Sequence, residues 1–103
     1  MNGDKIKKIA MYYGFNSQCR QLMEEMAELT VALNKYHRLC DGMDNTPSCY
    51  LDVISSVDSI KEEIADVTIM IEQIKFLLDI SDDDVEKISD RKLDRQIKRM
   101  EKE

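Results

Sequence analysis

The sequence contains one short acidic pattern twice: residues 24–29 read Glu-Glu-Met-Ala-Glu-Leu and residues 62–67 read Glu-Glu-Ile-Ala-Asp-Val. Both copies lie in segments where apolar residues recur every three or four positions, which indicates helices. In each copy the second acid and the last acid are three residues apart, one turn along one helical face. These four motif acids are Glu25, Glu28, Glu63 and Asp66.

The apolar periodicity around the two copies predicts two long helices, at about 17–38 and 53–79. Asn16 or Ser17 can cap the first of them. The segment between them, residues 40–51, holds Asp-Gly and the only proline and is therefore expected to be a loop. A connection of this length allows the two helices to pack in antiparallel directions.

Two further helices are expected at the ends of the chain. A short apolar pattern predicts one at about 4–13, with Gly14 as its stop. Ser81, followed by three aspartates, predicts the start of a last helix at about 82–101. The expected fold is all-α, a four-helix bundle-like single domain over residues 1–103 in which the two long antiparallel helices carry the acidic motifs.

The four motif acids share one offset from the expected helix–helix seam, because each lies just before an apolar stripe residue. In an antiparallel pair, flanking positions of the same offset meet on the same side of the seam. Both copies also lie at similar distances from the connecting loop. We therefore expect the four carboxylates to converge.

Such a cluster is unfavourable unless cations neutralise it. Although the chain has 15 Lys and Arg, none lies three or four residues from any motif acid, so a solvated face of helical ion pairs is the weaker interpretation. Four carboxylates without His or Cys in register are hard oxygen donors, which suit Mg²⁺ or Mn²⁺. The sequence therefore predicts a Mg²⁺ site, with Mn²⁺ as the alternative ion.

Composition limits the partners. The 103 residues carry a formal net charge of -6, which argues against nucleic acid or an anionic membrane as the main partner. No apolar run is long enough for a membrane helix, and the N-terminus lacks the apolar core of a signal peptide. Three scattered Cys fit reduced thiols. A cytoplasmic location is expected.

The double acidic motif, followed by Lys92-x-x-Arg95 in the last helix, resembles the MazG-like superfamily of all-α nucleoside triphosphate pyrophosphohydrolases. The resemblance covers about residues 13–100. It implies that the four motif acids bind Mg²⁺ and that Lys92 and Arg95 contact phosphate. The ordinary alternative for this basic pair is pairing with acids of its own helix.

The resemblance also implies hydrolysis of a nucleoside triphosphate to the monophosphate and pyrophosphate, and assembly as a homodimer or a tetramer. In that reaction a water on Mg²⁺ attacks the α-phosphorus and a carboxylate accepts its proton; Glu25 and Glu28 are the two candidates for this base. Two alternatives stay open: a phosphoribosyl-ATP pyrophosphohydrolase-like enzyme, and a non-catalytic helical interaction module.

Two amides continue the acidic face toward the N-terminus, Gln18 and Gln21. An amide offers both a donor and an acceptor and can read the edge of a base. These residues are the candidates for base binding, although exposed glutamines are often inert.

Overall fold

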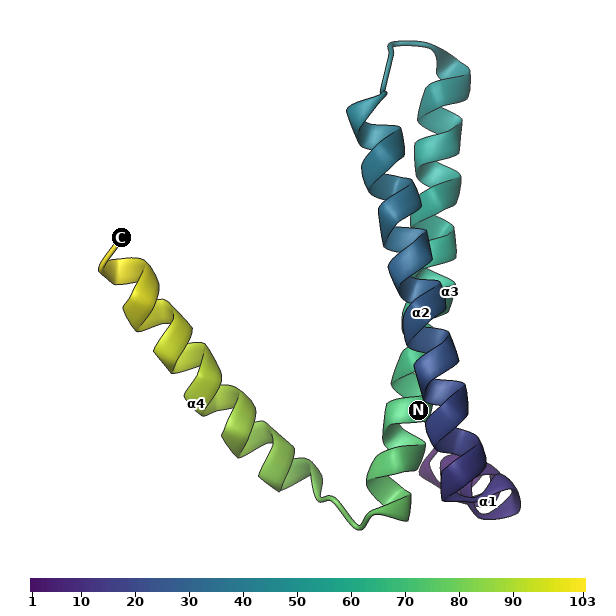
Figure 1. Ribbon diagram of the computed structural model, residues 1–103, viewed down its shortest axis with the longest axis vertical. Helices are drawn as coiled ribbons and strands as arrows, with labels where there is room; N and C mark the ends of the chain where they lie inside the picture. The colour runs from purple at the N-terminus through teal and green to yellow at the C-terminus, as the bar shows by residue number, and fades with distance from the viewer.

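The computed structural model describes residues 1–103 and contains four helices and no strand: α1 (Gly3–Tyr13), α2 (Phe15–Asp41), α3 (Pro47–Leu77) and α4 (Asp82–Glu101). Helices α2 and α3 lie side by side in opposite directions as a long hairpin (Figure 1). Helix α1 packs across the open end of this hairpin, against both long helices. The expected all-α class and the antiparallel pair are confirmed.

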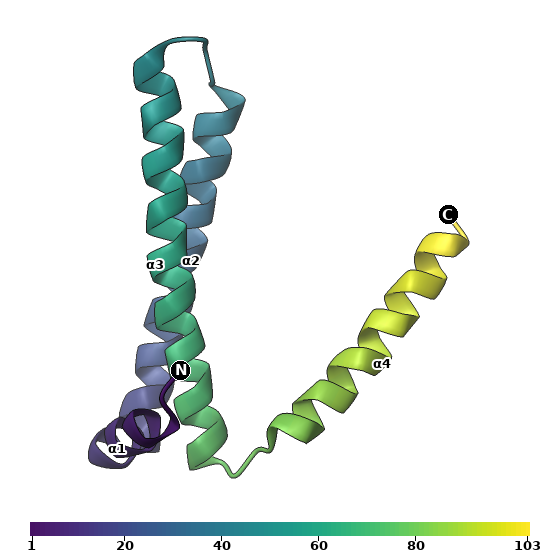
Figure 2. The same ribbon diagram turned by 180° about the vertical axis from the view of Figure 1, so that it is seen from behind.

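Helix α4 stands apart from the other three. It packs against no other helix, and all of its residues are exposed. Figure 2, the view from behind, shows α4 projecting away from the hairpin after a short turn at the end of α3. Within one chain the structure is therefore a three-helix unit with a free fourth helix, whereas the sequence predicted that all four would pack together.

The boundary between α1 and α2 depends on a single glycine. Gly14 has a φ of 82°, a conformation that favours glycine, and its N–H donates to the Ala10 carbonyl to close α1. Its own carbonyl accepts from the Gln18 N–H at 3.1 Å, so α2 begins at once with Phe15. The expected caps Asn16 and Ser17 are therefore wrong, since both lie inside the helix.

The α2–α3 loop is shorter than expected, covering residues 42–46 rather than 40–51. The Thr46 hydroxyl accepts from the Cys49 N–H at 3.3 Å and caps α3. Pro47 then occupies the first helical turn, where its missing N–H costs nothing. The predicted start near residue 53 was late because proline was interpreted only as a helix breaker.

The corner between α3 and α4 is held by one lysine. Lys75 Nζ lies 3.0 Å from the Glu72 carboxylate and also contacts the Asp82 carboxylate in the first turn of α4. The hydrogen bond to Asp82, followed by that to Glu72, raises the pKa of Lys75. Ser81 caps α4 by accepting from the Asp84 N–H at 3.1 Å, and the predicted bounds of α4 are confirmed.

The core of a single chain is small. Only six of the 103 residues are buried, three of them apolar (Ile6, Ala10 and Met70) and three polar (Gln18, Ser56 and Gln73). The Gln18 and Gln73 side chains bond to each other across the α2–α3 seam, where the Gln18 amide donates to the Gln73 carbonyl oxygen. This bond satisfies two amides that would be costly to bury alone.

Candidate metal centre

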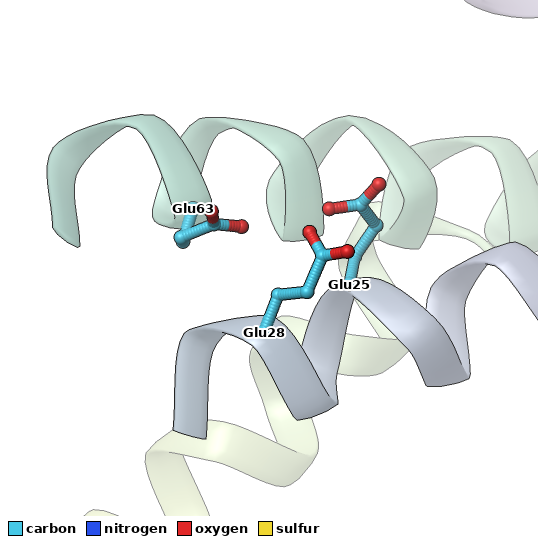
Figure 3. A group of neighbouring side chains, drawn as sticks. All are labelled: Glu25, Glu28 and Glu63. Carbon is cyan, nitrogen blue, oxygen red and sulfur yellow. The ribbon is translucent and has the colours of Figure 1, made fainter. Parts of the chain in front are cut away.

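Three of the four motif acids meet between the two long helices. Glu25, Glu28 and Glu63 each offer a carboxylate oxygen, and these oxygens all lie within 4.8 Å of one another. Figure 3 shows Glu25 and Glu28 extending from α2 toward α3 and the Glu63 carboxylate entering the same space. We call these three residues the carboxylate cluster.

Each half-buried glutamate of the cluster has one oxygen without a protein partner. The Gln21 amide donates to Glu25 Oε1 at 2.8 Å, whereas Glu25 Oε2 is buried and accepts no hydrogen bond. Glu63 Oε2 is also buried and unpartnered. Leaving a buried polar atom unpaired is costly, and the cost is larger for a charged group. The protein itself provides no positively charged partner for either oxygen.

The third member, Glu28, is exposed and responds to its neighbours. Its pKa is raised above the ordinary value, chiefly by the negative charge of Glu25 and next by that of Glu63. Partial desolvation and a hydrogen bond with Glu25 act in the same direction. The three carboxylates thus repel one another at neutral pH.

The fourth motif acid, Asp66, lies at the edge of this arrangement. It is exposed and is not among the acids whose oxygens fall within 4.8 Å. Its charge still raises the pKa of Glu28, as the smallest of the contributions. The structure therefore brings together three of the four expected ligands, and Asp66 is near enough for its charge to affect the pKa of Glu28.

No lysine or arginine neutralises the motif acids, because none of the four takes part in an ion pair. One cation does line the groove beside Glu28 and Glu63, namely Lys35 of α2. Lys35 was not predicted to belong to the site, because it lies more than one helical turn from every motif acid. Its spacing of seven residues from Glu28, two turns along the same face, is the signal that indicates its place beside the cluster.

The donor set fits a small divalent cation. Two oxygens bound to one Mg²⁺ at about 2.0–2.1 Å can be at most about 4.2 Å apart. The cluster oxygens lie within 4.8 Å of one another, so the three carboxylates would move closer together around one bound Mg²⁺. The buried Glu25 and Glu63 oxygens and the exposed Glu28 carboxylate would hold the ion, leaving its remaining positions for water and ligand oxygens.

The other expected site residues have different surroundings. Gln18 is buried and bonded to Gln73, and Gln21 is bonded to Glu25, so both amides that were expected to read a base have partners inside the protein. Lys92 and Arg95 lie exposed on α4, which packs against neither α2 nor α3. Within a single chain they are not part of the carboxylate cluster.

Comparison with protein-family models, with curated proteins and with solved structures finds no match for this chain. The helices themselves are too polar or too short for any of them to cross a membrane.

Proposed function

We propose that this protein is a Mg²⁺-dependent hydrolase that converts a nucleoside triphosphate to the monophosphate and pyrophosphate. The observation that carries the proposal is the carboxylate cluster, in which two buried glutamate oxygens have no hydrogen bond and no motif acid has an ion pair. This arrangement suits a divalent cation, and the resemblance of the double acidic motif to the MazG-like enzymes supplies the reaction. Mn²⁺ is the alternative ion.

The residues of the site have different roles in the proposed reaction, because their surroundings differ. Bound Mg²⁺ would activate the attacking water and neutralise phosphate charge. Glu25 is held in place by the Gln21 amide, which favours a ligand role. Glu28 is the exposed carboxylate of the cluster, so a proton that it accepts can pass on to solvent. With one oxygen on the ion, Glu28 would keep its other oxygen free to accept the proton, and it is therefore our choice for the general base.

The surface of the hairpin supports the proposed homodimer. Along α2, and along α3 from Ile60 onward, the apolar stripe alternates with a period of seven between half-buried residues in the α2–α3 seam and exposed ones. The half-buried set is Leu22, Leu29, Tyr36, Ile60, Val67 and Ile74, and the exposed set is Met26, Leu33, Ile64, Ile71 and Leu78. Two apolar positions per heptad, only one of them covered, are typical of a helix pair that packs against a second pair.

Helix α4 offers the second contribution to such a dimer. Residues 91–99 of this helix include five bases, while α2 and α3 carry the unneutralised cluster. The bases are Arg91, Lys92, Arg95, Lys98 and Arg99. Because α4 does not pack on its own hairpin, we propose that Lys92 and Arg95 reach the phosphates bound at the cluster of the second copy. A tetramer would repeat the same exchange.

The test is pyrophosphate release from a panel of substrates. The panel contains the standard ribo- and deoxyribonucleoside triphosphates and phosphoribosyl-ATP, assayed with Mg²⁺ and with EDTA. We expect release from at least one nucleoside triphosphate, abolished by EDTA and by Glu28→Gln. Glu24→Gln is the matched control, because Glu24 is exposed on the same helix and lies outside the cluster.

The outcomes separate the alternatives. Release from phosphoribosyl-ATP alone would assign the sister activity. An absence of release from every substrate, with intact helical structure, would contradict the proposal and favour a non-catalytic helical module. Activity that survives Glu28→Gln as well as it survives Glu24→Gln would show that the cluster does not perform the reaction.

A further inference from the structure

A groove runs from the carboxylate cluster toward the α2–α3 loop. Its first part, of about 370 Å³, has Glu28 and Glu63 along it together with Lys35 and Ser59. A second part, of about 250 Å³, shares Lys35 and Ser59 with the first and is lined by Lys35, Leu39, Asp52, Ser55, Ser56 and Ser59. We call this second part the serine groove. Its lining is almost entirely polar, with three hydroxyls, one cation and one carboxylate.

Ser56 is the unusual member of this lining. It is only 4% exposed, and its Oγ has no hydrogen-bond partner in the protein. Several other helical hydroxyls in this chain bond to the carbonyl four residues earlier, as Thr30 does at 3.0 Å and Ser59 at 3.3 Å. A buried hydroxyl that makes no such bond lacks the partner that would offset its removal from water. Ser56 lines the serine groove, so rotation of its side chain would bring this hydroxyl to an acceptor bound there.

Lys35 is the cation that the two parts of the groove have in common. Its ammonium forms no ion pair, and in particular none with Asp52, which lines the serine groove with it. Lys35 lies two helical turns from Glu28, about 10.5 Å along the helix axis on the same face. A triphosphate held at the cluster and the long lysine side chain can together span this separation.

We propose that the serine groove binds a phosphate group of a polyphosphate ligand whose other phosphates are held at the carboxylate cluster through Mg²⁺. Lys35 supplies the positive charge, and Ser56 donates its otherwise unpartnered hydroxyl to a phosphate oxygen. The inference rests on the metal site of the proposed function and extends it, because it gives the polyphosphate a direction along the hairpin, toward the α2–α3 loop.

The test is calorimetric titration of the full-length protein with inorganic tripolyphosphate in excess Mg²⁺. Charge-assisted hydrogen bonds are the stronger ones, so we expect Lys35→Gln to weaken binding by about tenfold and Ser56→Ala by a smaller factor of several-fold. Ser56→Ala should fold normally, since alanine favours helices and removes an unpaired hydroxyl. Its melting temperature, recorded in parallel, should be no lower than that of the wild type.

Two variants serve as matched controls. Lys61→Gln removes the same charge from an exposed lysine that is paired with Asp58, and Ser89→Ala removes a hydroxyl from α4 that is bonded to the Val85 carbonyl. Both should bind tripolyphosphate within about twofold of the wild type, because surface pairs contribute little.

Asp52→Asn tests whether Lys35 contacts phosphate or instead pairs with Asp52 in solution. If Lys35 contacts phosphate, the loss of the Asp52 charge removes a repulsion and tightens tripolyphosphate binding. If Asp52 instead orients Lys35, the same change weakens binding and overturns the proposal. Unchanged affinity in either Lys35→Gln or Ser56→Ala, or no binding by the wild type, also overturns it.

The outcome of this binding experiment is independent of the outcome of the test for hydrolysis. Binding of tripolyphosphate that depends on Lys35, without pyrophosphate release from any nucleotide, would reject the hydrolase and keep the phosphate site. Pyrophosphate release with no effect of Lys35→Gln on tripolyphosphate affinity would do the reverse.

Discussion

Glu28 on α2 and Glu63 on α3 direct their carboxylates into one space between the helices, and together with Glu25 they place three oxygens within 4.8 Å of one another. Like charges at this separation repel, and the proximity of Glu25 and Glu63 raises the pKa of Glu28. The proximity of the three carboxylates is therefore unfavourable at neutral pH, and a divalent cation bound among them would offset the repulsion.

The first prediction concerns stability against pH without metal. The folded protein holds the Glu28 proton more tightly than the unfolded chain does, because the Glu28 pKa is raised above 4.5. The resulting stabilisation is fully present below pH 4.5 and is lost as the pH rises through the raised pKa. In EDTA, Glu28→Gln should therefore melt close to the wild type at acidic pH and above it at neutral pH.

Thermal melts followed by circular dichroism between acidic and neutral pH provide this comparison. Glu24→Gln, the exposed acid outside the cluster, is the control and should show no such growing difference. The difference in melting temperature between Glu28→Gln and the wild type could instead stay constant with pH or shrink toward neutral pH. Either result would mean that the neighbouring carboxylates do not raise the pKa of Glu28.

The second prediction concerns the buried amide pair. Gln73→Leu removes the acceptor of the Gln18 amide and leaves that amide buried. The free energy of unfolding should fall by about 1–3 kcal/mol. In the double variant Gln18→Leu/Gln73→Leu both amides are gone, and much of the loss should be recovered. Urea denaturation at one fixed protein concentration measures both changes; additive losses in the double variant would speak against a coupled pair.

The third prediction concerns assembly. Leu33 is 47% exposed and Ile71 is 44% exposed in the single chain, so a polar residue at either position is compatible with the folded hairpin. In the proposed dimer these side chains are covered, and Leu33→Lys or Ile71→Lys should shift the protein from dimer to monomer in sedimentation equilibrium. Asn34→Lys, which adds the same charge to the neighbouring exposed position, should remain dimeric. A wild type that is monomeric at micromolar concentration would rule out the dimer.

Much of the architecture follows from local sequence signals. Apolar spacing predicted all four helices, and Ser81 before three aspartates gave the start of α4, since a cap acts only on its own first turn. The beginning of α3 was placed too late, because Pro47 is favourable at the first turn of a helix and unfavourable further in, and the sequence alone did not decide between the two.

The candidate site could be predicted only in part from local sequence signals. The three-residue spacing of the acids predicts which face each occupies, and the structure brings Glu25, Glu28 and Glu63 together. The bond between Gln18 and Gln73 depends on the register of two helices, to the nearest turn, which local spacing does not determine. The separation of α4 from the hairpin was not predicted. Its apolar residues do not form one continuous stripe, so the sequence does not indicate which helix α4 packs against.

Titration of the metal-free protein with Mg²⁺ is the most direct test of the carboxylate cluster as a metal site. The wild type should give a saturable binding heat, and Mg²⁺ at a hundred times its Kd should add about 2.7 kcal/mol to the free energy of unfolding. Glu28→Gln should weaken Mg²⁺ binding at least about tenfold, whereas Glu24→Gln should not. A wild type that shows neither binding heat nor a rise in Tm with Mg²⁺ or Mn²⁺, or a Glu28→Gln variant that binds as the wild type does, would contradict the account.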